Sequence, residues 1–295
     1  MDTGKVSRRF FAEHIAPRLG ADRDDVAVGP KHGVDFGVLD VGGRAVVTAT
    51  DPVSVLPDLG WARAGRFAVD IVLADVAVSG IPPSHLTVSL SLPPEMTDGE
   101  FDHLWAAVDA ECRDLGVSIV TGHTARYPGA SYPWVGAATA MAVGDRGDVV
   151  RPDGARPGDD LLVTKGPAVE AVGLLLTLFP EAVPLSGEAL STAQARLAVD
   201  ADAVPLRPGV ETACEALAMD PWRATTSGTL LVAVDPEDTD AVLGALEARG
   251  TPVGVAGRVE AGSGVTVDGA DAAEPDGDSS WAVYERLLEN REDGN

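Results

Sequence analysis

Three short segments in the first half of the chain place an aspartate at a predicted strand end or inside a predicted helix: Gly33-Val34-Asp35, Thr50-Asp51-Pro52 and Ala74-Asp75. A fourth segment, Gly122-His123-Thr124, follows them in order. Mg²⁺ prefers oxygen ligands, and a nucleotide site needs carboxylates on separate loops to join the metal to phosphate. The spacing therefore predicts a magnesium–nucleotide site. The alternative is a set of three turn or cap aspartates in an acidic protein.

The composition is strongly acidic. The 295 residues include 46 Asp and Glu but only 22 Lys and Arg, for a formal net charge of −24. The acidic residues are spread along the chain, which disfavours nucleic acid and anionic membranes as partners. Lysine occurs only at Lys5, Lys31 and Lys165. We therefore expect a halophilic protein, in which many acidic side chains serve solvation in concentrated salt, where their mutual repulsion is screened.

The two cysteines, Cys112 and Cys214, have neither a nearby cysteine nor a metal-spaced histidine, so we expect no disulfide framework and no zinc site. Cys112 continues an apolar helical face, which predicts a core position instead of a nucleophile. No window reaches the ~18 apolar residues that a membrane span needs, and an apolar signal segment is lacking at the N-terminus. These features predict a cytoplasmic protein.

The sequence predicts a series of strands and helices around the three aspartate segments. Gly42-Gly43 separates two Val-rich runs of alternating polarity, which predicts a hairpin over 36–41 and 44–50. Helical spacing of apolar residues predicts a helix over 62–79, with Asp75 one turn inside its C-terminal part. Thr97 to Glu100 has the pattern of a capping box and begins a helix that extends to 115. Further strands are predicted at 86–92, 117–121 and 134–143.

This order predicts an α+β layer in which helices cover one side of a mainly antiparallel sheet. Small residues at 136–140 suit close packing against another sheet, so we expect a homodimer that covers the open face. A Pro- and Gly-rich segment at 151–158 predicts a domain boundary, and a second domain begins at Asp159. Its predicted strands are 161–164, 229–234 and 253–259, and its predicted helices are 170–179, a helix capped by Asp235-Pro236-Glu237-Asp238 that ends at Gly250, and 281–288.

Taken in order, these segments resemble the aminoimidazole-ribotide (AIR) synthase superfamily, also called PurM-like, and most closely its archaeal "AIR synthase related" and HypE-like group. The resemblance covers nearly the whole chain. It rests on the aspartate segments and on Gly4-Lys5, the continuation of the third segment to Gly80, Gly122-His123-Thr124, Thr164-Lys165-Gly166, the segment 204–208, and Thr226-Ser227-Gly228-Thr229-Leu230-Leu231.

The resemblance implies a PurM-like two-domain α+β fold. The N-terminal domain, 1–150, would pair its mixed sheet with that of a partner subunit to form a dimeric barrel, and a shortened C-terminal α/β domain would span 159–290. ATP and Mg²⁺ are the implied cofactors. The implied activity is transfer of the γ-phosphoryl group to an oxygen of a small-molecule or carboxamide substrate, which activates a carbonyl or amide or makes a phosphate ester. Catalysis would rest mainly on positioning and charge neutralisation.

The resemblance also assigns roles to individual residues. The implied magnesium ligands are Asp35, Asp51 and Asp75. The other implied nucleotide contacts are Gly33, where glycine would let the backbone approach phosphate closely, and Gly122 and Thr124.

Several positions depart from the family pattern. Ala74 stands where the family usually has Asn, and His123 stands where several members have a metal-binding Asp. His123 and Lys165 are the candidate catalytic residues. For His123 the alternative is a buried, hydrogen-bonded histidine, and for Lys165 it is a solvated strand end. Between 170 and 205 the family's His-Asp-x-Thr-x-Gly-Gly motif is missing.

Three functional hypotheses remain open. The first is an ATP-dependent phosphoryl-transfer enzyme of the ligase or kinase type. The second is a non-catalytic nucleotide-binding or scaffold dimer that has lost the C-terminal phosphate motif. The third is an acidic two-domain binding protein without a nucleotide site. Hydrogenase nitrile chemistry is not expected because the chain ends in Glu292-Asp293-Gly294-Asn295 and not in cysteine, and selenophosphate synthesis is not expected because a reactive N-terminal cysteine is missing.

Overall fold

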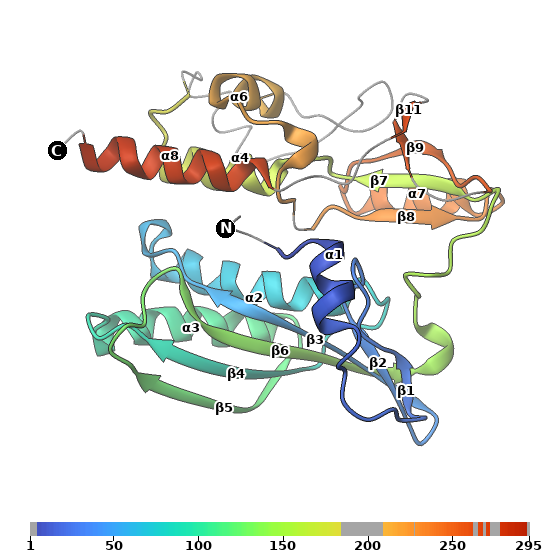
Figure 1. The fold of residues 1–295 in the computed structure, drawn as a ribbon, viewed down its shortest axis with the longest axis horizontal. Coiled ribbons are helices and arrows are strands. Elements are labelled where there is room, and N and C mark those ends of the chain that lie inside the picture. Colours follow the sequence, from blue (N-terminus) through green and yellow to red (C-terminus); the bar gives the residue numbers. More distant parts are fainter. Residues whose placement is uncertain are drawn as a thin grey trace. The chain divides into compact units, whose positions relative to one another are not determined.

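The computed structural model describes residues 5–183, 209–226, 228–261, 265–267, 270–271 and 278–293. The chain divides into two compact units. One comprises Arg8–Pro152, and the other comprises Asp153–Asn295 together with Met1–Ser7. Figure 1 shows the elements of each unit along the chain. Within the described residues, no helix is both long and apolar enough to cross a membrane.

The first unit is built on a six-stranded mixed sheet with the strand order β1-β2-β3-β6-β4-β5. Neighbouring strands are antiparallel except β4 and β5, which are parallel because α3 connects them as a crossover. The strands are β1 (Val26–Val28), β2 (Gly37–Val41), β3 (Arg44–Ser54), β4 (His85–Leu92), β5 (Ser118–Arg126) and β6 (Trp134–Asp145). The helices are α1 (Arg8–Phe10), η1 (Phe11–Ile15), η2 (Pro57–Leu59), α2 (Trp61–Ala77), α3 (Asp98–Asp114) and η3 (Arg146–Asp148).

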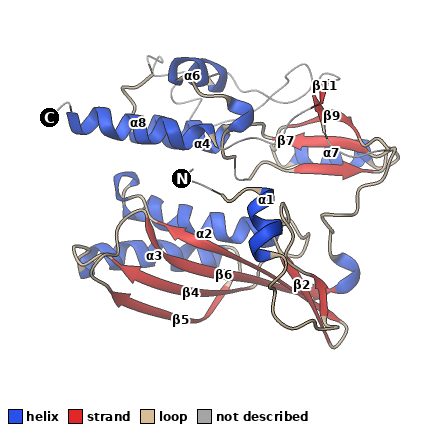
Figure 2. Ribbon diagram, in the orientation of Figure 1, coloured by secondary structure: helices blue, strands red, loops and turns tan. Residues whose placement is uncertain are grey.

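Helices α2 and α3 pack against each other and form a shared core with one face of the sheet (Figure 2). Gly65 allows their close approach, because a Cβ atom at this position would lie 2.5 Å from the backbone oxygen of Leu104. The predicted capping box begins α3, with the Thr97 side chain accepting from the backbone N–H of Glu100. Cys112 is buried in this core, which confirms its predicted packing role.

The opposite face of the same sheet, here called the hydroxyl face, is lined by threonine and serine side chains. Thr50 and Thr139 lie across β3 and β6, with 2.8 Å between their Oγ1 atoms. The other hydroxyl residues of this face, as strand alternation and register place them, are Thr48, Thr87, Ser89 and Ser91. This is the open face that the sequence predicted.

The small residues of β6 have a different role from the predicted one. Ala138 and Ala140 are buried on the helix side of the sheet, where α2 packs against β6. At Gly136 a Cβ atom would lie 2.0 Å from the Ser89 oxygen, so the pairing of β4 with β6 requires glycine there. The prediction that this whole stretch serves packing against a second sheet is therefore wrong, since much of it serves the unit's own core.

Two strands extend four or more residues past their predicted ends. The β2–β3 hairpin turns at Gly42 and Gly43, both at positive φ as a primed turn requires, but β3 continues past Thr50 to Ser54 because β6 pairs with it along most of that length. β5 continues past Thr121 to Arg126 because it pairs with β4 throughout. The corrected bounds matter because Asp51 and Gly122 now lie inside strands.

The second unit contains a three-stranded antiparallel sheet with the order β8-β7-β9. Helices α4, α6 and α8 contribute to a separate apolar core that includes Phe179 and Cys214. The strands are β7 (Asp160–Thr164), β8 (Leu231–Val234), β9 (Val253–Arg258) and the pair β10 (Thr266–Val267) and β11 (Ala270–Asp271). The helices are α4 (Val169–Leu178), α6 (Val210–Leu217), η4 (Pro221–Arg223), α7 (Thr239–Ala248) and α8 (Ser279–Asp293).

One cap in this unit differs from its prediction. The Asp235 side chain accepts from the backbone N–H of Glu237 in a turn, and α7 begins only at Thr239. Thr239 instead donates to Asp160 at 2.8 Å, and Arg258 donates to the same carboxylate at 3.0 Å. The three residues tie α7, β7 and β9 together, and both hydrogen bonds hold the pKa of Asp160 below its ordinary value.

Candidate functional site

Asp51 lies within β3, directly opposite Ala138 of β6. Alternation along the strand turns its side chain to the same side as buried Ala49 and Val53, while its neighbour Thr50 faces the hydroxyl side. Asp51 is half-buried. A carboxylate on the helix side of a sheet loses hydration, so its position favours pairing with a cation.

Asp75 lies in the last turn of α2 and is half-buried, between buried Val72 and Val76 along the helix. The C-terminal end of a helix carries partial negative charge, so a cation beside a carboxylate there is favourable. α2 packs against β3, the strand that carries Asp51. The Asp75 carboxylate is therefore suited to a cation.

Asp35 and Gly33 lie in the segment that leads into β2. Gly33 adopts φ +78°, a conformation that favours glycine, and Asp35 is exposed. Gly37, the first residue of β2, pairs with Thr48 of β3. Asp35 lies two residues before Gly37, and the antiparallel pairing places it near the part of β3 that contains Thr50 and Asp51. Asp35 and Asp51 thus belong to the same end of the β2–β3 hairpin, away from its Gly42-Gly43 turn.

The three aspartates do not form a ready-made metal cage. Across the part of the chain that the structure describes, no three His, Cys, Asp or Glu side chains are grouped to hold a metal ion. Mg²⁺ usually binds through one or two carboxylates and completes its shell with water and phosphate oxygens, so such a cage is not a requirement for a magnesium–nucleotide site. The residues fit this donor set, and their assignment as ligands stays a prediction.

Gly122, His123 and Thr124 are not a loop, as the sequence had suggested, but the middle of β5. A Cβ atom at Gly122 would lie 2.4 Å from the backbone oxygen of Val88, so the β4–β5 pairing alone demands glycine. Thr124 is exposed on this outermost strand. Nucleotide contacts by Gly122 and Thr124 remain predictions, and Gly122 now has a structural reason of its own.

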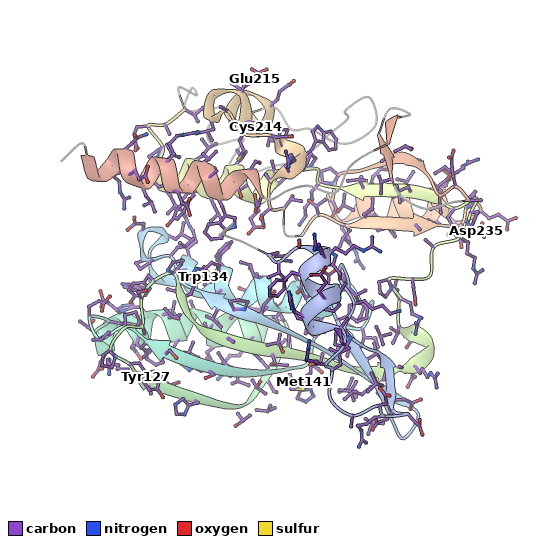
Figure 3. The ribbon with its side chains drawn as sticks, viewed as in Figure 1. Tyr127, Trp134, Met141, Cys214, Glu215 and Asp235 are labelled. Carbon is purple, nitrogen blue, oxygen red and sulfur yellow. The ribbon has the colours of Figure 1, made fainter. Side chains whose placement is uncertain are left out.

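His123 is exposed, so the prediction of a buried histidine is wrong. Its Nε2 atom lies 3.1 Å from the hydroxyl of Tyr127, which follows β5 at its end (Figure 3). His123 pairs with Ser89 across β4 and therefore shares the hydroxyl face of the sheet. The histidine–tyrosine pair could accept or donate a proton at this face, which keeps His123 a candidate catalytic residue.

Lys165 belongs to the second unit, at the end of β7. It is half-buried, and its role as a catalytic residue or as a solvated strand end stays undecided. Gly228 lies beside its ammonium, and Thr226 and Thr229 hydrogen-bond to the neighbouring Gly166. In the sequence, these residues were identified only as part of the segment 226–231 that resembles the family. The segment 204–208 and Ser227, which also belong to the resemblance, lie outside the described residues.

Neither cysteine is prepared for nucleophilic chemistry. Burial raises the pKa of the Cys112 thiol, and nearby carboxylates raise it further. Burial, with a contribution from Asp220, raises the pKa of Cys214 to about 12 (Figure 3). A thiol with a raised pKa is a poor source of thiolate at neutral pH.

Comparison with known families decides the relationship. Residues 33–144 match the model of the AIR synthase related protein, N-terminal domain, and residues 185–269 match that of its C-terminal domain. The chain belongs to the AIR synthase related family. The N-terminal match contains Asp35, Asp51, Asp75, Gly122 and Thr124. The predicted superfamily is therefore confirmed.

Among curated proteins, the chain is 26% identical to a carbamoyl dehydratase HypE of Rhizobium leguminosarum bv. viciae over 248 residues, which cover 70% of this chain and 71% of the relative. It is 21% identical to a putative hydrogenase expression/formation protein of Methanocaldococcus jannaschii over 278 residues, or 81% of this chain and 83% of the relative. Both relatives are similar across most of their length.

Solved structures show the same fold. E. coli HypE matches with a TM-score of 0.64 and 21% identity, covering 79% of this chain and 87% of that one. AaThiL complexed with AMPPCP and TMP matches with a TM-score of 0.63 and 20% identity, covering 82% and 89%. The predicted PurM-like two-domain α+β fold is confirmed. The roles assigned to the domains 1–150 and 159–290 stay predictions.

Proposed function

We propose that this protein is an ATP-dependent phosphoryl-transfer enzyme that binds Mg-ATP through Asp35, Asp51 and Asp75. The observation that carries the proposal is that the N-terminal family match, 33–144, contains all three aspartates. Two of them are half-buried carboxylates, on β3 and at the end of α2, where a cation offsets both lost hydration and the helix dipole.

The comparisons support this chemistry through the names of the related proteins. The AaThiL structure contains AMPPCP, an ATP analogue with a non-hydrolysable β–γ bridge, and TMP. The HypE relatives are named carbamoyl dehydratases, and a carbamoyl group is a carboxamide. We therefore place the acceptor among small molecules that present a carbonyl, amide or phosphate oxygen.

The proposed reaction transfers one group. An acceptor oxygen attacks the γ-phosphorus of ATP, a new P–O bond forms, the bond to the bridging β–γ oxygen breaks, and ADP leaves with that oxygen. The three aspartates would hold magnesium, which would supply charge neutralisation at the phosphates, and Gly33, Gly122 and Thr124 would contact the nucleotide. His123, paired with Tyr127, lies on the hydroxyl face of the sheet, opposite to the side of Asp51, so this reaction assigns it no proton transfer.

We further propose that the enzyme is a cytoplasmic homodimer in which the hydroxyl face of the six-stranded sheet contacts the same face of a second copy. Half-exposed threonines and serines on a sheet face can exchange hydrogen bonds across an isologous interface. His123 shares this face, so its surroundings in the dimer would include the partner copy.

A second candidate is a non-catalytic nucleotide-binding dimer. Ala74 favours it, because an apolar residue stands beside Asp75 where the family usually offers Asn. The missing His-Asp-x-Thr-x-Gly-Gly motif favours it as well, since a phosphate contact from the C-terminal domain would be lost.

Calorimetric titration of Mg-ATP into the wild type and into Asp51→Asn, in molar potassium chloride, tests the proposal. Wild type should bind, and Asp51→Asn should weaken binding by about 1.5–3 kcal/mol, or roughly ten- to a hundredfold, because a charge-assisted contact is removed. Asp102→Asn, an identical change at an exposed position of α3, is the matched control and should bind as wild type does.

The outcomes separate the candidates. ADP release that depends on an added carboxamide or phosphate acceptor supports the enzyme. Binding without turnover across both acceptor classes supports the non-catalytic dimer. A wild type that does not bind Mg-ATP contradicts both.

A further inference from the structure

The loop that follows β7 has an unusual backbone. Lys165 and Ala168, neither of them glycine, adopt φ +54° and φ +59°, and Gly166 between them adopts φ +105°. A side-chain-bearing residue in the left-handed region costs roughly 1 kcal/mol, so two such residues within four positions need support from the surrounding structure. Strain of this kind concentrates where a backbone is shaped for a ligand.

A second loop, between η4 and β8, supplies this support. The hydroxyls of Thr226 and Thr229 lie 3.2 and 2.9 Å from the backbone oxygen of Gly166 and donate to it. In return, buried Thr164 accepts from the backbone N–H of Leu230 at 2.8 Å. Hydrogen bonds in both directions therefore hold the two loops in one arrangement.

The same arrangement brings the Lys165 ammonium to Gly228. A Cβ atom at Gly228 would lie 3.1 Å from Lys165 Nζ, and Gly228 itself adopts φ +75°. The Lys165 ammonium thus lies beside the bare backbone of the second loop, and the positive φ of Gly228 is what favours glycine there. The half-burial of Lys165 restricts its side chain.

The charge of Lys165 is not used by a carboxylate in the described structure. The ion pairs that can be described join an arginine to Asp or Glu, as in Arg66–Glu111 and Arg146–Asp40. Lys165 is half-buried, and its charge has no carboxylate partner among the described residues, so an anionic ligand would be favourable beside it.

We propose that Lys165 and the loops at Gly166 and Gly228 form a phosphate-binding site in the second unit. Lysine is a compact charge with three donors, which suits a tetrahedral oxyanion, and the backbone of Gly228 beside it is exposed. The site uses no magnesium and none of the three aspartates, so it goes beyond the proposed function. Its ligand is a phosphate group, either free or carried by a nucleotide.

Acetylation of lysine provides a direct test, because the chain has only three lysines and each is resolved by peptide mass spectrometry. The wild-type protein is treated with sulfo-NHS-acetate at constant ionic strength, with increasing inorganic phosphate. Acetylation of Lys165 should slow saturably, by about threefold when phosphate reaches twice its Kd. Lys31, exposed in the other unit, should react at an unchanged rate and serves as the internal control.

Two further arms identify the source of the phosphate. Protection of Lys165 by inorganic phosphate in Asp51→Asn, equal to that in wild type, shows a site separate from the magnesium aspartates. Protection by ATP without magnesium, and not by inorganic phosphate, shows that the phosphate is carried by a nucleotide. In a calorimetric titration with phosphate, Lys165→Gln should show no heat of binding, whereas Lys31→Gln should bind phosphate as wild type does.

Equal acetylation rates for Lys165 with and without either ligand would overturn the proposal, whatever the outcome for Mg-ATP at the aspartates. Lys165→Gln that remains folded by circular dichroism and binds phosphate as well as wild type would overturn it too.

Discussion

At the scale of single residues, the structure shows why glycine is needed at two positions, and a sequence motif alone does not show this. Gly122 belongs to a family-like motif, yet its lack of a side chain is already demanded by the Val88 oxygen in the neighbouring strand. Gly228, in contrast, faces the end of a flexible lysine. The first glycine is explained by packing against a backbone atom, and the second by its positive φ, beside the Lys165 ammonium.

Gly122→Ala should therefore destabilise the first unit whether or not nucleotide is present. Its Cβ atom would lie 2.4 Å from a backbone oxygen, which forces β4 and β5 apart and costs about 1–3 kcal/mol. Gly99→Ala is the matched control, because a Cβ atom at this position has open space in the first turn of α3. This substitution should stabilise the folded protein by up to about 1 kcal/mol. Urea unfolding measures both, and equal effects would contradict the packing explanation.

At the scale of elements, a carboxylate with a raised pKa, that of Asp70, lies beside the contact between α2 and α3. Burial raises the pKa of Asp70 to about 6, and the nearby charge of Glu111 adds to the shift while Arg66 partly offsets it. Arg66 pairs with Glu111 at 3.0 Å, which leaves Asp70 as the third charge of the group. The two helices thus pack at an electrostatic cost that a change of pH can remove.

Because the folded state raises the pKa of Asp70 above the ordinary 3.8, it binds the proton more tightly than the unfolded chain does. The contribution of Asp70 to stability is therefore full below about pH 4 and is lost as the pH rises through about 6. Asp70→Asn should stabilise the protein at pH 7 and give no gain at pH 4 in urea unfolding. Asp102→Asn controls for the change of net charge. A gain of equal size at both pH values would show that Asp70 is not the titrating group.

At the scale of the whole molecule, charge dominates. A net charge of −24 on 295 residues destabilises a compact state through self-repulsion, and salt shortens the reach of that repulsion from about 10 Å at 0.1 M to about 3 Å at 1 M. If the protein is halophilic, salt should therefore stabilise the folded chain as a whole, without acting at any particular site.

The unfolding midpoint should rise by several degrees between 0.1 and 1 M potassium chloride, since each kcal/mol gained is worth about 2–4 °C in a chain of this size. Differential scanning calorimetry measures the shift at pH 7. At pH 4, where many carboxylates are protonated, the same salt step should raise the midpoint less. A midpoint insensitive to salt at pH 7 would contradict the halophilic expectation.

Much of this protein follows from local sequence. The Gly42-Gly43 turn, the capping box at Thr97 and the burial of Cys112 depend on neighbours within one turn or on one helical face, so pattern alone predicted them. The order of the motifs likewise identified the family, because order along a chain is itself a property of the sequence.

What the sequence left undecided depends on partners far along the chain. β3 extends past Asp51 because β6 pairs with it, and β5 extends past Gly122 because β4 does, so residues predicted in loops lie inside strands. The exposure of His123 and the approach of Lys165 to Gly228 have the same origin. The sequence by itself determined which residues are available for chemistry. Only the tertiary structure decided their environment, because hydrogen bonds between distant strands set which backbone atoms meet.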